Sequence, residues 1–463
     1  MTGGELGIRN KLLFALIFAV LLLQLMISPR IWHHGEAREG LVVQGIVHNH
    51  QWILPFRNGE LPSKPPLFHW IAALPALLFG VNDFTVRFPS LIGAEIMAIT
   101  TFLLGQAMGG RKTAWLAVGA LLGMYEFWDS AAQARVDMVF SACVTVAIAG
   151  FYFWYCDRSN AARATCYIAA ACAVLAKGPA GIALVGLVIV VFLGVERRFG
   201  LLGSLWSWPL VVIVLVIDLG WYGLAYHIGG DAFLALQLQH ENIDRALGTG
   251  DFDDHQDLLV LAVWFVTRML PWNLVLPWSL IRRLRGARED AAGHLLHVWW
   301  FSMAVLFALA AGKRAVYLLP LYPAIALLAA RATVEFGHRW AQFSATPGWS
   351  FGVGTPLPRR AAAKLIIAGI VAIDLAALIG SNGVWRNVKV RTARLSAIDK
   401  IGSMVPSNAT LFATPEVDNT ELIVIAYRLG REVKGKMLMC ANGDDYFLSP
   451  IDSSALPGVE NQT

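Results

Sequence analysis

The residues of this chain that could do chemistry are charged groups at the ends of apolar runs. Glu36 and Glu39 share the segment GEAREG, and Lys64 stands in SKPP, ahead of two prolines. Asp137 in ARVD and Lys177 in AKGP lie beside later apolar runs. Carboxylates can accept a proton or orient a nucleophile, whereas ammonium groups can stabilise a departing phosphate. Ionisable groups beside a bilayer are costly, so these positions favour a function.

Two of these groups also have a structural interpretation. Glu36 could stabilise the first turn of a helix, where the dipole favours a carboxylate. Lys64 could extend its ammonium group to the lipid headgroups. The stiff proline pair that follows it would, however, also hold this group rigidly enough to bind a phosphate. Lys177 stands at a break between helices, which is a suitable place to bind a lipid-linked anion. For Glu36 and Asp137 we favour a catalytic role over the structural one.

Two later segments add candidates of the same kinds. The first combines histidines, an acid and an arginine, but it has no HxH or HExxH spacing, so the metal signal is weak. The second has two cations and two tyrosines, and aromatic belts at membrane interfaces also produce such tyrosines. The candidates in these segments are His240, Glu241, Arg245, His255, Lys313, Arg314, Tyr317 and Tyr322.

The composition places these groups in a polytopic membrane protein. Of 463 residues, 57% are hydrophobic and 15% are charged, whereas soluble domains carry about 25% charged residues. Lys and Arg gather in cytoplasmic loops of such proteins, so a basic balance needs no nucleic-acid partner. The five cysteines show no metal-ligand spacing.

The apolar runs predict a helical bundle. The run Leu12 to Ile27 follows Arg9 and Lys11 and has no small-residue cleavage site, which predicts an uncleaved anchor with a cytoplasmic N-terminus. The run 65–79 is short and contains Pro75, so we expect it to lie at the membrane interface. Together with the anchor, ten later runs give about eleven spans: 88–108, 113–128, 138–155, 164–176, 179–195, 208–227, 258–281, 295–311, 314–334 and 363–382.

With 65–79 outside, the basic clusters of the loops fall on one side of the membrane, as the positive-inside rule requires. This predicts a transmembrane catalytic domain over 1–382, with a first outer loop over 30–87 that contains interfacial helices. The remaining segment, 383–463, is then outside. It has the composition of a small α/β domain, with a helix over 391–404 and short strands near Leu411 and Lys436. It could equally be a tail that shields loops.

The motifs, in their order, resemble those of a known family. GEAREG, NGELPSKPPLFHW, ARVDM, AKGPAG, HENIDR and KRAVYLLPLYP together are similar to the membrane GT-C glycosyltransferases of the aminoarabinose-transferase and protein-mannosyltransferase type. The resemblance covers roughly residues 10 to 335. It implies an all-α polytopic fold in a bacterial inner membrane, with a periplasmic active site and an undecaprenyl phosphate or other polyprenyl phosphate donor.

The resemblance also implies roles for individual residues. It makes Glu36 and Asp137 the acidic residues of the active site, and Lys64, Lys177 and Arg245 ligands of the donor phosphate. Two positions depart from the family pattern, because Gly35 and Ser63 stand where the family often has carboxylates. The second departure removes an acid thought to face a metal. No cofactor is therefore certain, and a divalent metal is left open.

We therefore expect an inverting displacement at the sugar C1, with the acceptor a lipid A or lipopolysaccharide-type molecule or another periplasmic acceptor. Glu36 or Asp137 would be the general base for a hydroxyl acceptor. A polymerase or ligase of lipid-linked glycans, or a transporter or flippase of lipid-linked sugars, is an alternative. Lys313 and Arg314 complete the predicted phosphate ligands. The remaining pocket candidates are Arg38, Glu39, His240, Glu241, His255, Tyr317 and Tyr322.

Overall fold

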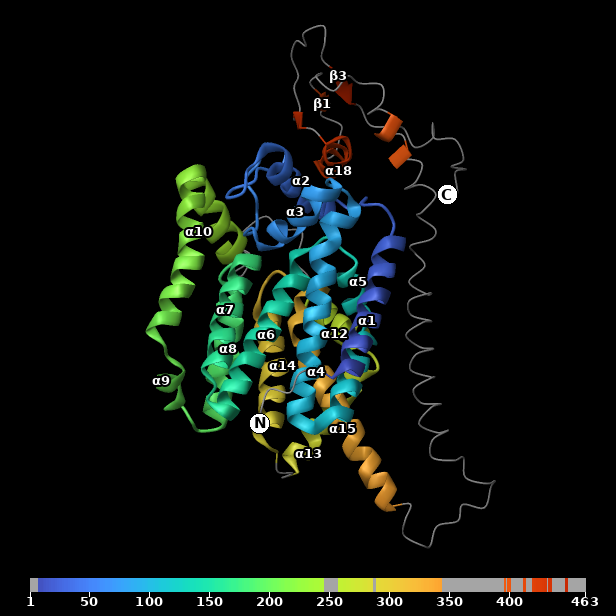
Figure 1. Cartoon of the computed structure of the whole chain (residues 1–463), viewed down its shortest axis with the longest axis vertical. Helices are drawn as coiled ribbons and strands as arrows, with labels where there is room; N and C mark the ends of the chain where they lie inside the picture. Colours follow the sequence, from blue (N-terminus) through green and yellow to red (C-terminus); the bar gives the residue numbers. More distant parts are fainter. Residues whose placement is uncertain are drawn as a thin grey trace, which may run out of the picture.

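The computed structural model of the protein is a bundle of long helices with two shorter helices and a small C-terminal part at one end (Figure 1). The residues that the structure describes are 7–244, 257–285, 289–343, 395–396, 398–400, 411–413, 419–430, 432–434 and 446–448. The expected span 363–382 and the strand expected at Lys436 lie outside these residues, as do Arg245 and His255.

The helices follow one another closely along the chain. The first half contains α1 (Ile8–Ile27), α2 (His34–Asn49), α3 (Leu67–Phe79), α4 (Asp83–Leu122), α5 (Tyr125–Ala131), α6 (Val136–Asp157), α7 (Asn160–Lys177) and α8 (Ala180–Val195). The second half contains α9 (Leu201–Leu205), α10 (Trp208–Leu234), the π-helix η1 (Ala235–Asp244), α12 (Leu258–Thr267), η2 (Trp272–Leu274), α13 (Val275–Leu284), α14 (Ala291–Leu309), η3 (Ala315–Leu321) and α15 (Tyr322–Phe343).

Among the residues that the structure describes, six helical segments are long and apolar enough to cross a membrane, or seven if the bent pair α12–α13 counts as one span. The six are α1, α4, α6, α10, α14 and η3 with α15. The predicted number of about eleven spans is therefore not confirmed in the described part of the chain.

Local breaks explain much of the difference. Gly110 has a φ of 79° and kinks α4, which ends at Leu122, so the run 113–128 does not form one helix. The run 258–281 is bent by 104° between α12 and α13. The run 179–195 forms α8, an apolar helix of 16 residues.

The two short helices that the first loop was expected to contain are present. A side-chain nitrogen of His33 accepts the backbone N–H of Gly35 and caps α2. α3 has 13 residues and includes Pro75, and it is too short to be a candidate span. α2 and α3 pack against each other, so the residues flanking them are brought together.

Small residues let the central helices approach closely. A Cβ on Gly150 of α6 would lie 2.7 Å from the backbone nitrogen of Cys166 in α7. A Cβ on Gly181 of α8 would lie 2.6 Å from the carbonyl carbon of Ala173 in α7. Such contacts between backbones are typical of helix packing in membranes. They fix the end of α7, which carries Lys177.

The C-terminal part lies at the same end as α2 and α3 (Figure 1). Its strands β1 (Leu411–Ala413), β2 (Val433–Lys434) and β3 (Tyr446–Leu448) are parallel in the order β2-β1-β3. Its helix α18 (Asn419–Leu429) packs on α2, where Gln44 donates a 2.9 Å hydrogen bond to the carbonyl oxygen of Tyr427. The strand expected near Leu411 is thus confirmed as β1.

Candidate active site

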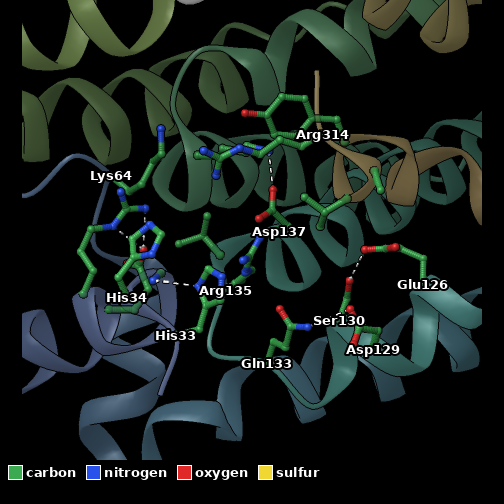
Figure 2. Close-up of a pocket in the computed structure, with 18 of the residues that line it drawn as sticks. His33, His34, Lys64, Glu126, Asp129, Ser130, Gln133, Arg135, Asp137 and Arg314 are labelled. Atoms are coloured by element: carbon green, nitrogen blue, oxygen red, sulfur yellow. Dashed lines mark hydrogen bonds and ion pairs between the residues drawn. The ribbon is translucent and has the colours of Figure 1, made fainter. Parts of the chain in front are cut away.

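A cavity of about 360 Å³ lies where the start of α2, α5, the start of α6, the end of α7 and η3 meet (Figure 2). Lys64 and His34 lie on one side, Glu126 and Asp129 on the other, and Asp137 between them. The ionisable side chains other than histidine and tyrosine that line the cavity are Arg38, Lys64, Arg135, Lys177, Arg268, Arg314, Glu39, Glu126, Asp129 and Asp137. A cavity with several cations and acids can bind a charged polar ligand.

Asp137 and Lys177 meet at the wall of this cavity. Lys177 is the last residue of α7, and Gly178, with a φ of 91°, ends that helix. The ammonium nitrogen of Lys177 lies 2.5 Å from Oδ1 of Asp137 and 4.3 Å from the ring centre of Tyr317. The glycine that ends the helix and this ion pair together hold the lysine at the cavity.

Lys64 is also held by a carboxylate. Its ammonium nitrogen lies 2.5 Å from Oε2 of Glu241 in η1, and both side chains are about nine-tenths buried. Burial strengthens such a pair relative to one in water. Lys64 lines the cavity just ahead of α3. Segments far apart in the sequence therefore place two ammonium groups at one site.

Glu39 is a buried anion at the edge of the cavity. Its Oε2 lies 2.7 Å from Nε2 of His69, and its Oε1 accepts a 3.1 Å hydrogen bond from Arg38. Burial alone would raise the pKa of Glu39, but Arg38 and His69 outweigh it and lower the pKa to about 2. Glu39 is therefore a poor proton acceptor and a good anchor for Arg38.

Glu36 does not line the cavity. Arg87 of α4 donates two 2.8 Å hydrogen bonds to its two carboxylate oxygens, and the backbone N–H of Ala134 donates a third at 2.8 Å. The side chains of Glu36 and Arg87 are 8% and 6% exposed. Glu36, which the resemblance makes an acidic residue of the active site, is thus placed outside the cavity lining, because α4 supplies a buried partner for its carboxylate.

Four acidic or basic residues of the cavity, histidines aside, were not among the candidate site residues: Glu126, Asp129, Arg135 and Arg268. Nη1 of Arg268 lies 3.2 Å from Oε2 of Glu126. Burial and the nearby Asp129 raise the pKa of Glu126 to about 7, because Arg268 and Arg135 only partly offset them. Arg268 stands three residues before Pro271. A charge beside such a helix break was the signal in the sequence that could have identified Arg268 as a cavity residue.

The other candidates are distributed as follows. Arg314 and Tyr317 line the cavity, while Lys313 does not and donates a 3.4 Å hydrogen bond to the carbonyl of Ala311. Tyr322 is fully buried, and its hydroxyl has no hydrogen-bond partner among the described residues. His240 and Glu241 lie in η1, and Glu241 reaches Lys64. In the described part of the chain, no group of three or more His, Cys, Asp or Glu side chains could hold a metal ion.

Comparison with known proteins adds relatives in sequence. The family described as dolichyl-phosphate-mannose-protein mannosyltransferase matches residues 63–221. The undecaprenyl phosphate-alpha-4-amino-4-deoxy-L-arabinose arabinosyl transferase of Shewanella sediminis is 26% identical, over 71% of this chain and 61% of the relative. Arabinosyl transferase 1 of Pseudomonas fluorescens strain Pf0-1, which has the same description, is also 26% identical. The match covers 86% of this chain and 70% of that relative. This chain thus spans less than two thirds of the Shewanella relative.

Solved structures share the fold. ArnT from Cupriavidus metallidurans bound to undecaprenyl phosphate has a TM-score of 0.73 and 19% identity, over 93% of this chain and 86% of that one. The oligosaccharyltransferase of Archaeoglobus fulgidus has a TM-score of 0.56 and 12% identity, over 93% of this chain and 65% of that one. The resemblance to membrane GT-C glycosyltransferases of the ArnT type and the mostly helical membrane fold are thereby confirmed.

Proposed function

We propose that this chain is a membrane glycosyltransferase that moves a sugar from a polyprenyl phosphate to a lipid A or lipopolysaccharide-type acceptor, or to another periplasmic acceptor. The observation that carries the proposal is that Lys64 and Lys177, from separate helical segments, line one cavity together with Arg314. The names of the relatives make undecaprenyl phosphate the carrier and 4-amino-4-deoxy-L-arabinose the first sugar to test.

The cations explain how the donor would react. In an inverting displacement the acceptor attacks C1 of the sugar while the bond from C1 to the phosphate oxygen breaks. Negative charge then develops on the leaving phosphate, and fixed cations that face it lower the barrier. Lys64, Lys177 and Arg314 supply this charge, and Arg245 and Lys313 remain proposed phosphate ligands. Because Glu241 and Asp137 hold the two lysines, little reorganisation is needed when the phosphate binds.

The acids take different parts in this proposal. Asp137 keeps its place as an acidic residue of the active site, where it orients Lys177. Glu36 acts as a positioning residue, because Arg87 engages both of its oxygens and joins α2 to α4. Arg38, Glu39, His240, Glu241, His255, Tyr317 and Tyr322 remain the proposed surroundings of the substrate.

The membrane orientation follows from the basic clusters of the loops. We propose that the cavity and residues 383–463 face the periplasm of a bacterial inner membrane and that the N-terminus is cytoplasmic. The catalytic domain would then be 1–382 with about eleven spans, and 383–463 would be a small α/β domain. The packing of α18 on α2 supports the proposal that the first loop and the segment 383–463 lie on the same side of the membrane.

Binding of the carrier tests the proposal directly. Lys64→Ala and Lys177→Ala should each weaken binding of undecaprenyl phosphate to the purified protein about tenfold or more, because a hydrogen bond to a charged group contributes about 1.5–3 kcal/mol. Lys112→Ala is the matched control, since this lysine is exposed and does not line the cavity. Transfer of labelled 4-amino-4-deoxy-L-arabinose to lipopolysaccharide from cells without the gene measures turnover. Wild-type affinity in both cavity variants would contradict the assignment.

A further inference from the structure

Glu126 has a carboxyl group in the cavity, and the reaction proposed above assigns no role to it. Its side chain is buried and belongs to α5, a short helix that follows the end of α4. Figure 2 shows it beside Ser130 and Asp129, across the cavity from Lys64. It therefore faces the space that the donor phosphate and the acceptor would share.

The contacts of Glu126 are looser than those of the other cavity acids. Lys177 lies 2.5 Å from Asp137, and His69 lies 2.7 Å from Glu39. Asp129 accepts a 2.8 Å hydrogen bond from Gln133. Glu126 has Arg268 at 3.2 Å and a weak hydrogen bond of 3.4 Å from Ser130. Of the four described acids that line the cavity, Glu126 makes the longest polar contacts, and its buried Oε2 has no hydrogen-bond partner among the described residues, so this oxygen can accept one more hydrogen bond.

The charges around Glu126 come from several elements. Burial and Asp129 raise its pKa to about 7, and Arg268 and Arg135 prevent a larger rise. A carboxyl that titrates near neutral pH can both accept and release a proton during turnover. The titratable or charged groups that interact with it are Asp129 of its own helix, Arg135 and Asp137 at the start of α6, Arg268 after α12 and the phenol of Tyr322 in α15.

We propose that Glu126 is a further catalytic residue, the general base that accepts the proton of an acceptor hydroxyl as its oxygen attacks the sugar C1. The bond between the acceptor oxygen and C1 forms while the bond between C1 and the phosphate oxygen breaks. The electron pair of the broken bond leaves with the polyprenyl phosphate, which Lys64 and Lys177 face, and the proton ends on Glu126. This inference rests on the proposed transferase function.

The inference also names the class of acceptor. A phosphate acceptor is already ionised near neutral pH and needs no base, whereas a hydroxyl must lose a proton. A buried base in the cavity is therefore of use when the acceptor is a hydroxyl group. The product would be a glycoside that resists mild acid, and not a glycosyl phosphate, which mild acid cleaves.

The experiment compares Glu126→Gln and Glu126→Asp with wild type. Undecaprenyl phosphate-4-amino-4-deoxy-L-arabinose serves as the labelled donor, and lipopolysaccharide from cells without the gene serves as the acceptor. We expect Glu126→Gln to lower kcat about 100-fold to 10,000-fold while its affinity for undecaprenyl phosphate stays close to that of wild type. Glu60→Gln is the matched control, because Glu60 is 70% exposed and does not line the cavity.

The pH profile separates a base from a structural residue. The base acts when ionised, so the kcat of wild type should rise with pH through about 7 and then level off. Glu126→Asp should keep a rising limb, and Glu126→Gln should lose it. A limb that survives in Glu126→Gln, or labelled product that mild acid releases, would overturn the inference.

The two proposals fail in different ways. If wild type binds undecaprenyl phosphate and transfers sugar while Glu126→Gln keeps its kcat within about threefold, the base assignment is wrong and the transferase function stands. If wild type neither binds the carrier nor transfers sugar, both fall. Should Glu126→Gln not fold, a wild-type profile that is flat across neutral pH overturns the base assignment by itself.

Discussion

The buried pair of Glu36 and Arg87 gives a direct test of whether Glu36 is a positioning residue or a base. The perturbations are Glu36→Gln, Arg87→Met and the two together. Glu36→Gln keeps the size of the side chain and an oxygen for the N–H of Ala134, but it leaves the Arg87 guanidinium buried without its counter-charge. Arg87 would also keep its 2.8 Å hydrogen bond to the carbonyl oxygen of Pro29.

The magnitude follows from burial and geometry. Both side chains are less than a tenth exposed and share two 2.8 Å hydrogen bonds. Removing one partner of such a pair costs about 3–5 kcal/mol, whereas replacing both charges is often close to neutral. Glu36→Gln and Arg87→Met should thus each lower the free energy of unfolding by about 3 kcal/mol or more. The double variant should lose clearly less than the sum of the two.

The assay is unfolding of the purified protein by SDS in mixed micelles, combined with sugar transfer by each variant. We expect a favourable coupling energy of about 1–3 kcal/mol between the two sites and recovery of much of the kcat in the double variant. A double variant that is stable yet has a kcat about 100-fold below wild type would refute the positioning role of Glu36 and indicate that it is the base. If the losses in free energy of unfolding of the two single variants simply add in the double variant, the two side chains do not interact and the ion pair is refuted.

Three further predictions use the same preparations. Gly40→Ala should lower the free energy of unfolding by about 1–3 kcal/mol, since its Cβ would lie 2.3 Å from the ring of Tyr427, and Tyr427→Leu should recover part of it. Folding lowers the pKa of Glu39 from 4.5 to about 2, so its contribution of about 3 kcal/mol is present above pH 4.5 and lost as the pH falls toward 2. Unfolding of Glu39→Gln should lack this dependence. Arg268→Ala should move the rising limb of kcat to higher pH, because this arginine lowers the pKa of Glu126.

Sequence reasoning located the cavity because its cations mark the ends of apolar runs. Lys64 ahead of a proline pair and Lys177 ahead of Gly-Pro are visible as charges at breaks between helices. Treating 65–79 as a helix too short to span placed Lys64 on the same side as Asp137 and Lys177. In the structure all three line one cavity, so local signals and topology were sufficient for these residues.

The partners of buried charges were beyond the same reasoning. Arg87 follows Glu36 by 51 residues and stands at the edge of an apolar run. No local sequence pattern therefore predicts that the two side chains pair. Glu126 lies near the end of the run 113–128, which the sequence predicts to be one span. Because α4 ends at Leu122 and α5 begins at Tyr125, the carboxyl of Glu126 reaches the cavity. Tertiary packing, and not local pattern, determined both outcomes.

The charge balance of the cavity connects these assignments. Of the described residues, six cationic side chains and four carboxylates line it, so these cations outnumber these acids by two when every acid is ionised. The proposed donor, a polyprenyl phosphate sugar, carries one negative charge, and a second would develop on the phosphate as the bond to C1 breaks. The excess cations therefore match the charge of the leaving group better than that of the bound donor, which is the condition for lowering a barrier. Uptake of a proton by Glu126 would remove one acid at the moment the second charge appears.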